Sequence, residues 1–151
     1  MTSFFPDLNV WLALTVEGHA RSEQAWRWTG ALPTGARLLF SRYTQLGLLR
    51  LLTNKAVMGS YTLTLNKAWR VYDRWLADTR VEFRREPRNL EDTFREVTRP
   101  FSGQSAPQAF GDSYLLAFAA SANATLVTFD GALHALAVRQ GRLSLIPGGS
   151  R

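Results

Sequence analysis

The sequence predicts an α/β fold, a three-layer α/β/α sandwich with a mostly parallel central sheet, and three observations lead to it. Several short segments are apolar throughout, as expected of strands buried on both faces of a sheet. Segments with helical spacing separate them, an order typical of parallel sheets. The chain has 151 residues, 46% of them hydrophobic, which is enough for one substantial core. We therefore expect a single domain over residues 1–147 and a flexible C-terminal tail at 148–151.

In the first half of the chain, apolar runs and the residues that end them indicate the positions of strands and helices. The opening strand ends at Asp7, where a loop or helix follows. Further on, Leu46, Leu49 and Leu52 recur at helical spacing, and Asn54 is a suitable stop for that helix. The expected elements are a strand from Ser3 to Asp7, a helix over about 18–30, a strand at 37–41, a helix at 42–54 and a helix over about 64–77.

The second half contains one clear long loop, at residues 99–107, directly upstream of an acidic motif. Asp112 is expected to precede the buried helix at 114–120, and Asp130 is expected at the end of the next strand. The expected elements are a strand at 81–84, a helix at 90–97, the long loop, a helix within 108–123, a strand at 125–130, a helix at 131–139 and a strand at 142–146.

The charge of the chain favours a polyanionic partner. Its 18 basic residues, 16 of them arginine, exceed its 12 acidic residues and give a net charge of +6. Basic side chains near phosphates release counterions, so nucleic acid is one candidate partner and an acidic protein is another. The absence of cysteine excludes disulfides and thiolate metal sites. No apolar run reaches the ~18 residues of a membrane helix and no signal peptide is evident, so we expect a cytoplasmic protein without membrane contact.

Three aspartates are candidates for one metal site. Asp7 and Asp130 each end a predicted strand, and ligands of parallel sheets bind beyond the carboxyl ends of the strands. Asp112 precedes the helix that leads to the second of these strands, so its side chain can reach the same edge. Three carboxylates in one place repel one another, and Mg²⁺ or Mn²⁺ is the usual means of stabilising them. Such a site can cut phosphodiesters.

Each candidate residue also has a purely structural interpretation. Asp7 can cap a helix, Asp112 can be an N-cap, and Asp130 can form a turn before Gly131. The supporting candidates are equally open. Asn9 either orients Asp7 or bonds nearby backbone, Thr128 either packs in a strand or serves the metal site, and Arg50 either extends to solvent or pairs with a phosphate or carboxylate.

Four segments, in this order along the chain, resemble the VapC-like PIN-domain ribonuclease toxins of type II toxin–antitoxin systems. They are residues 6–12 (PDLNVWL), 47–54 (GLLRLLTN), 111–119 (GDSYLLAFA) and 126–130 (LVTFD). The resemblance implies a PIN-like domain, usually a homodimer, that hydrolyses RNA (tRNA, rRNA or mRNA) with Mg²⁺ or Mn²⁺ and is inhibited by a cognate antitoxin. It assigns Asp7, Asp112 and Asp130 as metal-binding residues, with Thr128 and Asn9 in the family's accompanying polar positions.

The chain departs from the family pattern at one acid. The family normally supplies a further carboxylate, commonly glutamate, from the helix after the second strand. Here Gln45 and Gly47 stand at the candidate positions, and no Asp or Glu occurs between Glu23 and Asp73. Glutamine can hold a metal-bound water but adds no charge and cannot act as a base. We therefore expect a three-aspartate site supported by Gln45, with weakened metal affinity.

Two other functions compete with the nuclease. The missing acid would also suit a PIN-like module that has lost efficient catalysis and binds RNA or protein. A phosphatase of the haloacid dehalogenase type is suggested by the strand-ending segment at residues 7–9. That family places a second aspartate where this chain has Asn9 and a lysine near the later acids, and neither is present.

Overall fold

The computed structural model describes residues 2–148, and its centre is a five-stranded sheet in which every strand pair is parallel. The strand order is β3-β2-β1-β4-β5, so β1 lies in the middle and the chain crosses over it between the two halves of the sheet. This confirms the predicted parallel α/β architecture. The strands are β1 (Ser3–Pro6), β2 (Arg37–Phe40), β3 (Val81–Phe83), β4 (Ala124–Val127) and β5 (Ser144–Leu145).

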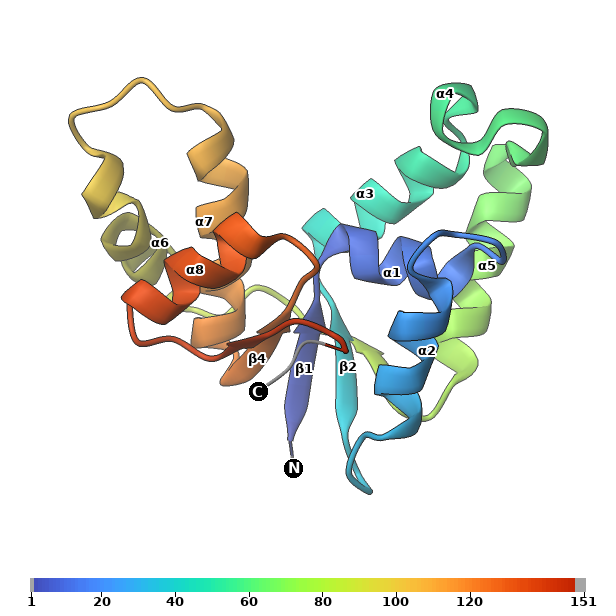
Figure 1. The fold of residues 1–151 in the computed structure, drawn as a ribbon, viewed down its shortest axis with the longest axis horizontal. Helices are drawn as coiled ribbons and strands as arrows, with labels where there is room; N and C mark the ends of the chain where they lie inside the picture. Colours follow the sequence, from blue (N-terminus) through green and yellow to red (C-terminus); the bar gives the residue numbers. More distant parts are fainter. Residues whose placement is uncertain (1, 149–151) are drawn as a thin grey trace.

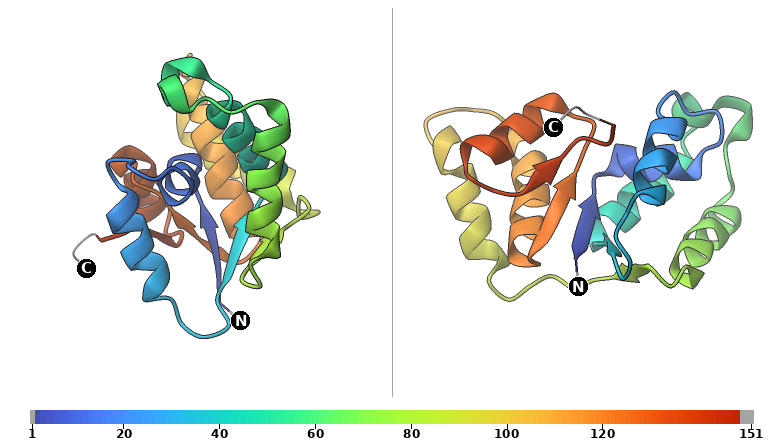
Figure 2. Two further views of the ribbon diagram at one scale, coloured as in Figure 1. Left: turned by 90° about the vertical axis from the view of Figure 1, so that its right-hand side faces the viewer. Right: turned by 60° about the horizontal axis from the view of Figure 1, so that its bottom comes forward.

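Helices cover both faces of the sheet, as Figures 1 and 2 show. On one face α1, α2, α3 and α5 pack on the first core, and on the other α6, α7 and α8 pack on the second. The helices are α1 (Leu8–Thr15), α2 (Ser22–Gly30), α3 (Arg42–Leu52), α4 (Lys55–Met58), α5 (Leu65–Ala77), α6 (Leu90–Thr98), α7 (Gln108–Ser121) and α8 (Gly131–Arg139), with 3-10 turns η1 (Gly59–Tyr61) and η2 (Arg99–Phe101).

The alternation of side chains along the strands creates the two cores. Phe4 and Leu38 belong to the core beneath α1, α2, α3 and α5, whereas their neighbours Phe5 and Leu39 belong to the core beneath α6, α7 and α8. Successive side chains of a strand point to opposite faces, so strands that are apolar at every position serve both cores. The predicted three-layer sandwich follows directly from that pattern.

The structure corrects several predicted boundaries. The opening strand is followed at once by a helix, α1, which is one of the two expected continuations. The strand before Asp130 ends at Val127 rather than at residue 130. The last strand is confined to Ser144–Leu145, and α4 with η1 lies in a region for which no element was predicted. The strand of the site is shorter because residues 128–130 turn away from the sheet, and Asp130 then caps the next helix.

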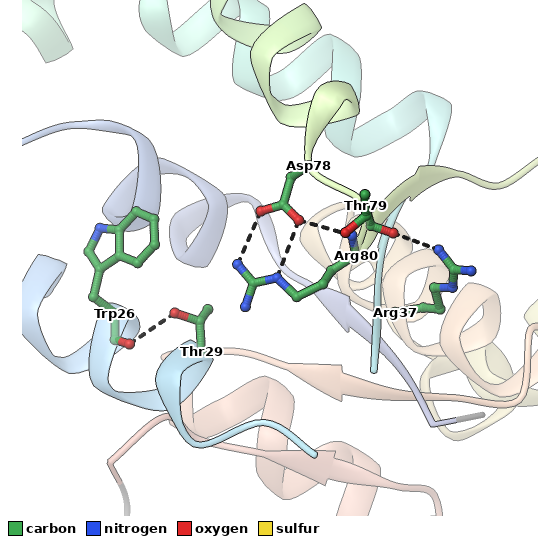
Figure 3. Close-up of polar contacts among 6 residues, drawn as sticks. All are labelled: Trp26, Thr29, Arg37, Asp78, Thr79 and Arg80. Carbon is green, nitrogen blue, oxygen red and sulfur yellow. Dashed lines mark hydrogen bonds and ion pairs between the residues drawn. The ribbon is translucent and has the colours of Figure 1, made fainter. Parts of the chain in front are cut away.

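Polar contacts hold the amino ends of β2 and β3 together, at the edge of the sheet opposite the acids (Figure 3). Arg37 Nη1 donates to the carbonyl of Thr79 at 2.7 Å, and the Arg80 guanidinium pairs with the Asp78 carboxylate at 3.1 Å. Hydrogen bonding by Arg80 holds the pKa of Asp78 below its usual value. Nearby, Thr29 Oγ1 donates to the carbonyl of Trp26 at 2.9 Å in the last turn of α2. The contacts made by Arg37 and Arg80 fix the connection from α5 into β3.

The end of the described chain returns to α2. Gln24 Nε2 donates to the carbonyl of Pro147, and Gly148 lies so close that a Cβ there would be 2.7 Å from Gln24 Cγ. Residue 148, predicted to begin a flexible tail, therefore packs against a helix, and residues 149–151 of that tail lie outside the described residues. No helix formed by residues 2–148 is long and apolar enough to cross a membrane.

Candidate active site

Asp7 is placed by the end of β1 and the start of α1. Its backbone N–H donates to the carbonyl of Val127 at 2.7 Å, which joins it to the end of β4. Its carboxylate accepts the backbone N–H of Leu8 at 2.6 Å through Oδ1 and the hydroxyl of Thr128 at 2.9 Å through Oδ2. Asp7 is thus the N-cap of α1 and a buried carboxylate, with 8% of its surface exposed.

Thr128 links two of the predicted acids. Its fully buried hydroxyl donates to Asp7 Oδ2 and accepts the backbone N–H of Asp130 at 3.0 Å. Asp130 in turn caps α8, because its Oδ1 accepts the N–H groups of Ala132 and Leu133 at 2.9 and 3.2 Å. The capping interpretation of Asp7 is therefore correct as geometry, whereas Asp130, which was expected to form a turn before Gly131, caps a helix. The two caps place both side chains at the same edge of the sheet.

Asp112 lies inside a helix rather than before one. α7 begins at Gln108, after Pro107, so the N-cap interpretation of Asp112 is wrong. The helix starts earlier than predicted because residues 108–110 extend it by a turn ahead of Gly111. The carboxylate of Asp112 is half-buried and accepts no hydrogen bond from residues 2–148, so both of its oxygens are open.

The three carboxylates are close enough to repel one another, and this repulsion adds to the effect of burial on their pKa values. Burial raises the pKa of Asp112 above its usual value, and the charges of Asp130 and Asp7 raise it further. Burial also raises the pKa of Asp7, against the hydrogen bonds from Thr128 and Leu8, and Asp130 adds to the rise. Among residues 2–148, no Lys or Arg forms an ion pair with any of the three. The three aspartates form an electrostatically uncompensated group.

The carboxylate oxygens of the three aspartates are the kind of ligand that a hard divalent cation prefers. As placed in the structure, the three side chains do not surround a metal position. Within the described chain, no three His, Asp or Glu side chains lie close enough together to hold a metal ion as placed. The two oxygens of Asp112 and Oδ2 of Asp130 accept no hydrogen bond from residues 2–148. Oxygen ligands and excess negative charge are what Mg²⁺ or Mn²⁺ requires.

Gln45 and Gly47 occupy different surroundings on α3. Gln45 is buried, its Oε1 accepts Arg42 Nη1 at 2.5 Å, and its side chain is also hydrogen-bonded to Tyr72. Gly47 instead packs on the residue that follows Asp7, since a Cβ there would lie 2.7 Å from Leu8 Cδ2. A carboxylate at position 47 would have to displace Leu8, whereas one at position 45 would fit the existing space.

The two remaining supporting candidates make no contact with the acids in the described part of the chain. Asn9 is exposed in the first turn of α1, and neither of the hydrogen bonds considered for it is present among residues 2–148. Arg50 is exposed near the end of α3 and pairs there with no described carboxylate, in agreement with an arginine that extends to solvent.

Sequence reasoning missed Tyr43, which borders the site. Tyr43 stands in the first turn of α3, and a Cβ at position 111 would lie 3.0 Å from its hydroxyl oxygen. The signal was Gly111 itself. A glycine inside a helix, immediately before Asp112, costs helix stability and so indicates a close approach by another side chain.

Comparison with known proteins places this geometry in a family. A family model of the PIN domain matches residues 4–139. The chain is similar to Ribonuclease VapC41 of Mycobacterium tuberculosis, with 38% identity over 128 residues that cover 82% of this chain and 86% of the relative.

Solved structures share the fold at low identity. VapBC2 from Rickettsia felis matches with a TM-score of 0.69 and 13% identity, covering 96% of this chain and 98% of that one. VapC20 of M. tuberculosis, described as a sarcin–ricin loop cleaving toxin, matches with a TM-score of 0.64 and 21% identity, covering 87% and 93%. Because the family model spans most of the chain and a relative of 38% identity supports it, the chain belongs to the PIN-domain family, among its VapC-like members.

Proposed function

We propose that this protein is a Mg²⁺- or Mn²⁺-dependent endoribonuclease that hydrolyses RNA phosphodiesters as the toxin of a type II toxin–antitoxin pair. One observation carries the proposal: Asp7, Asp112 and Asp130, from three separate elements, lie within electrostatic reach of one another at the carboxyl edge of the sheet. Relatedness to Ribonuclease VapC41 supports the choice of RNA as the substrate.

The three aspartates have different parts in this proposal. Asp7 is the rigid member, because burial and hydrogen bonds from Leu8 and Thr128 hold both of its oxygens. Asp112 and Asp130 contribute oxygens that accept no described hydrogen bond. A bound Mg²⁺ or Mn²⁺ would lower the pKa of a water molecule and offset charge that develops during in-line displacement at phosphorus. Thr128 acts as a positioning residue, since its hydroxyl fixes the Asp7 carboxylate and the turn that carries Asp130.

Substrate approach follows from the charge distribution. The chain carries a net charge of +6, yet the site itself is acidic. Arginines elsewhere attract the RNA backbone, and the cation then neutralises the carboxylates where the backbone must approach them. We expect cleavage to weaken steeply as salt concentration rises.

A cleavage assay tests the proposal. Purified protein is incubated with total RNA in Mg²⁺, in Mn²⁺ and in EDTA, alongside the variants Asp112→Asn and Asp92→Asn. We expect cleavage with either metal, none in EDTA, and a loss of about a hundredfold or more in Asp112→Asn, because it removes a proposed ligand. Asp92 is an exposed acid of α6, so its variant should cleave normally. Full activity of Asp112→Asn would disprove the assignment of the site.

A second candidate function is a PIN-like module that binds RNA or protein without efficient catalysis. The observation that favours it is Gln45, one of the two candidate positions for the family's further acid, whose amide oxygen accepts a hydrogen bond from Arg42. The variant Gln45→Glu distinguishes the two. If the site is a weakened metal centre, the added charge should lower the dissociation constant for Mg²⁺ several-fold in titration calorimetry. No metal-dependent turnover by wild type or variant would favour the binding module.

The proposed partners are a cognate antitoxin and a second copy of the chain. The antitoxin and the homodimer are both implied by the family resemblance. Similarity to solved VapBC structures from Rickettsia felis and Haemophilus influenzae supports the antitoxin. Co-expression with the product of the adjacent reading frame tests it: the antitoxin should co-purify and suppress cleavage. Light scattering of the isolated chain tests the dimer.

A further inference from the structure

A group of aromatic rings crosses from α3 to α6 and α7 beside the candidate site. Tyr43 of α3 contacts Tyr114 of α7 with ring centroids 5.3 Å apart, and Tyr114 contacts Phe94 of α6 at 5.7 Å. Phe94 contacts Phe110 at 6.3 Å. We call these four residues the aromatic ledge. The rings of Tyr114 and Phe94 are half-buried, whereas the two ends are exposed, Tyr43 to 44% and Phe110 to 62%. Tyr43 is the end whose hydroxyl approaches Gly111, the residue before Asp112.

Two observations place Tyr43 at the mouth of the site. Its hydroxyl lies against the turn of α7 that carries Asp112, since a Cβ at Gly111 would be 3.0 Å from Tyr43 Oη. The strand register gives the same position, because Phe4 of β1 pairs with Leu38 of β2. Counting three residues along both strands sets Asp7 beside Ser41, the N-cap of α3, and Tyr43 follows two residues later.

On its own helix Tyr43 has a basic neighbour, whereas Tyr114, which it contacts, donates to the Glu86 carboxylate at 3.2 Å. Arg42 precedes it, with its guanidinium 4.5 Å above the Phe83 ring and bonded to Gln45. α3 has no acidic residue, and its charged residues are Arg42 and Arg50. One side of the site therefore presents an aromatic face and a fixed cation, and the other presents carboxylates. A nucleotide has the matching parts, a flat base for the ring and a phosphate for the cation and the metal site.

We propose that Tyr43 is a base-stacking residue that holds an unpaired nucleotide next to the phosphodiester to be cleaved. This inference rests on the proposed nuclease function and extends it to substrate structure. A base within a duplex already stacks on its neighbours, so a ring at the mouth of the site favours RNA whose bases are free in loops or single strands. Tyr43 acts on binding and positioning and takes no part in proton transfer.

Binding measurements test the proposal in an Asp112→Asn background, in which the RNA stays intact. The probe is a fluorescein-labelled, nonrepeating single-stranded RNA of roughly 12 nucleotides, with single abasic sites introduced at each position in turn. We expect Tyr43→Phe to bind like the parent and Tyr43→Leu to bind roughly tenfold more weakly or worse, since each stacked base contributes substantially to affinity. Tyr61→Leu is the matched control, because Tyr61 is a more exposed tyrosine at the tip of another helix pair.

Binding of the abasic RNAs distinguishes a stacking role of Tyr43 from a purely structural one. In the parent, one abasic position should weaken binding about tenfold, and in Tyr43→Leu the same abasic site should have no further effect. Circular dichroism and thermal melting confirm that each variant is folded. An unchanged affinity in Tyr43→Leu, or an abasic effect that survives the substitution, would overturn the stacking role. It would point instead to a protein contact at this surface.

Cleavage assays in the wild-type background separate this inference from the proposed function. If the wild type cleaves RNA with Mg²⁺ and Tyr43→Leu has the same KM and kcat, only the stacking role of Tyr43 is wrong. If the wild type neither binds nor cleaves RNA under any metal condition, the nuclease function fails, and the stacking role fails with it. A higher KM with little change in kcat in Tyr43→Leu supports both the nuclease function and the stacking role of Tyr43.

Discussion

Thr128 shows how much of the candidate site depends on a single hydroxyl. It is fully buried, donates to the Asp7 carboxylate and accepts the N–H of Asp130. In sequence it looks like any β-branched residue in an apolar strand, for which packing is the more common role. Its hydrogen bond to Asp7 joins residues 121 positions apart, and that connection exists only in the folded chain.

Replacing Thr128 by valine should lower the free energy of unfolding by about 1–3 kcal/mol, because the buried Asp7 carboxylate loses its donor and the part-buried N–H of Asp130 loses its acceptor. Urea denaturation measures the change. Thr125→Val in the preceding strand β4 is the matched control, since the half-buried Thr125 hydroxyl makes no hydrogen bond within residues 2–148. That control should stay within about 0.5 kcal/mol of the wild type. Equal effects of the two variants would contradict the role given to Thr128.

At the scale of elements, the site depends on how closely α3 approaches α1. Gly47 permits that approach, since any side chain there would meet Leu8, the residue directly after Asp7. The glycine lies within a helix, where it costs roughly 1 kcal/mol relative to alanine, so its presence reflects a packing requirement. The α1–α3 crossing thereby holds the start of α1, and with it the backbone of Asp7.

Gly47→Val should destabilise the protein by about 1–3 kcal/mol, because its added methyl groups overpack the helix crossing. Leu8→Ala removes the atoms that clash, so the double variant should be more stable than the sum of the two single changes predicts. The double-mutant cycle is measured by thermal and urea unfolding of the wild type, the two single variants and the double variant. Strict additivity would show that Leu8 does not limit this position.

At the scale of the whole molecule, the acidic site opposes folding until a cation neutralises it. Burial and neighbouring charges raise the pKa of Asp7 and of Asp112 in the native state. The native protein then binds protons at a higher pH than the unfolded chain does. Stability from these groups is complete below the unfolded value near 3.8 and is lost as pH rises through the raised native values.

Comparing Asp112→Asn with the wild type isolates this contribution. Without metal, the variant should have the higher Tm near neutral pH, and the difference should shrink as pH falls toward 3.8, where the wild-type carboxyl is protonated. Adding Mg²⁺ should reverse the order near neutral pH. At a concentration 100 times the dissociation constant, binding stabilises the wild type by about 2.7 kcal/mol. A Tm unaffected by Mg²⁺ at every pH would argue against a metal site.

The sequence alone determined the three-layer fold and the position of Asp7 directly after the first strand, because apolar runs and the residues that end them are local properties of the chain. It placed the end of the strand before Asp130 three residues too late, since β4 ends at Val127. The motifs at 6–12, 111–119 and 126–130 likewise indicated the family without any coordinates. Local patterns also misled, since the pair Gly111-Asp112 reads as a helix start but lies within α7.

Only the tertiary structure decided what each candidate residue contacts. It joined Asp7 to Asp130 through Thr128, turned Gln45 toward Arg42, and set Tyr43 against Gly111 beside Asp112. These contacts join different elements or depend on the rotation of a helix, and a shift of one or two residues in a helix changes the face that it presents. No pattern of spacing along the chain contains that information, because it arises when the helices pack on the two faces of the sheet.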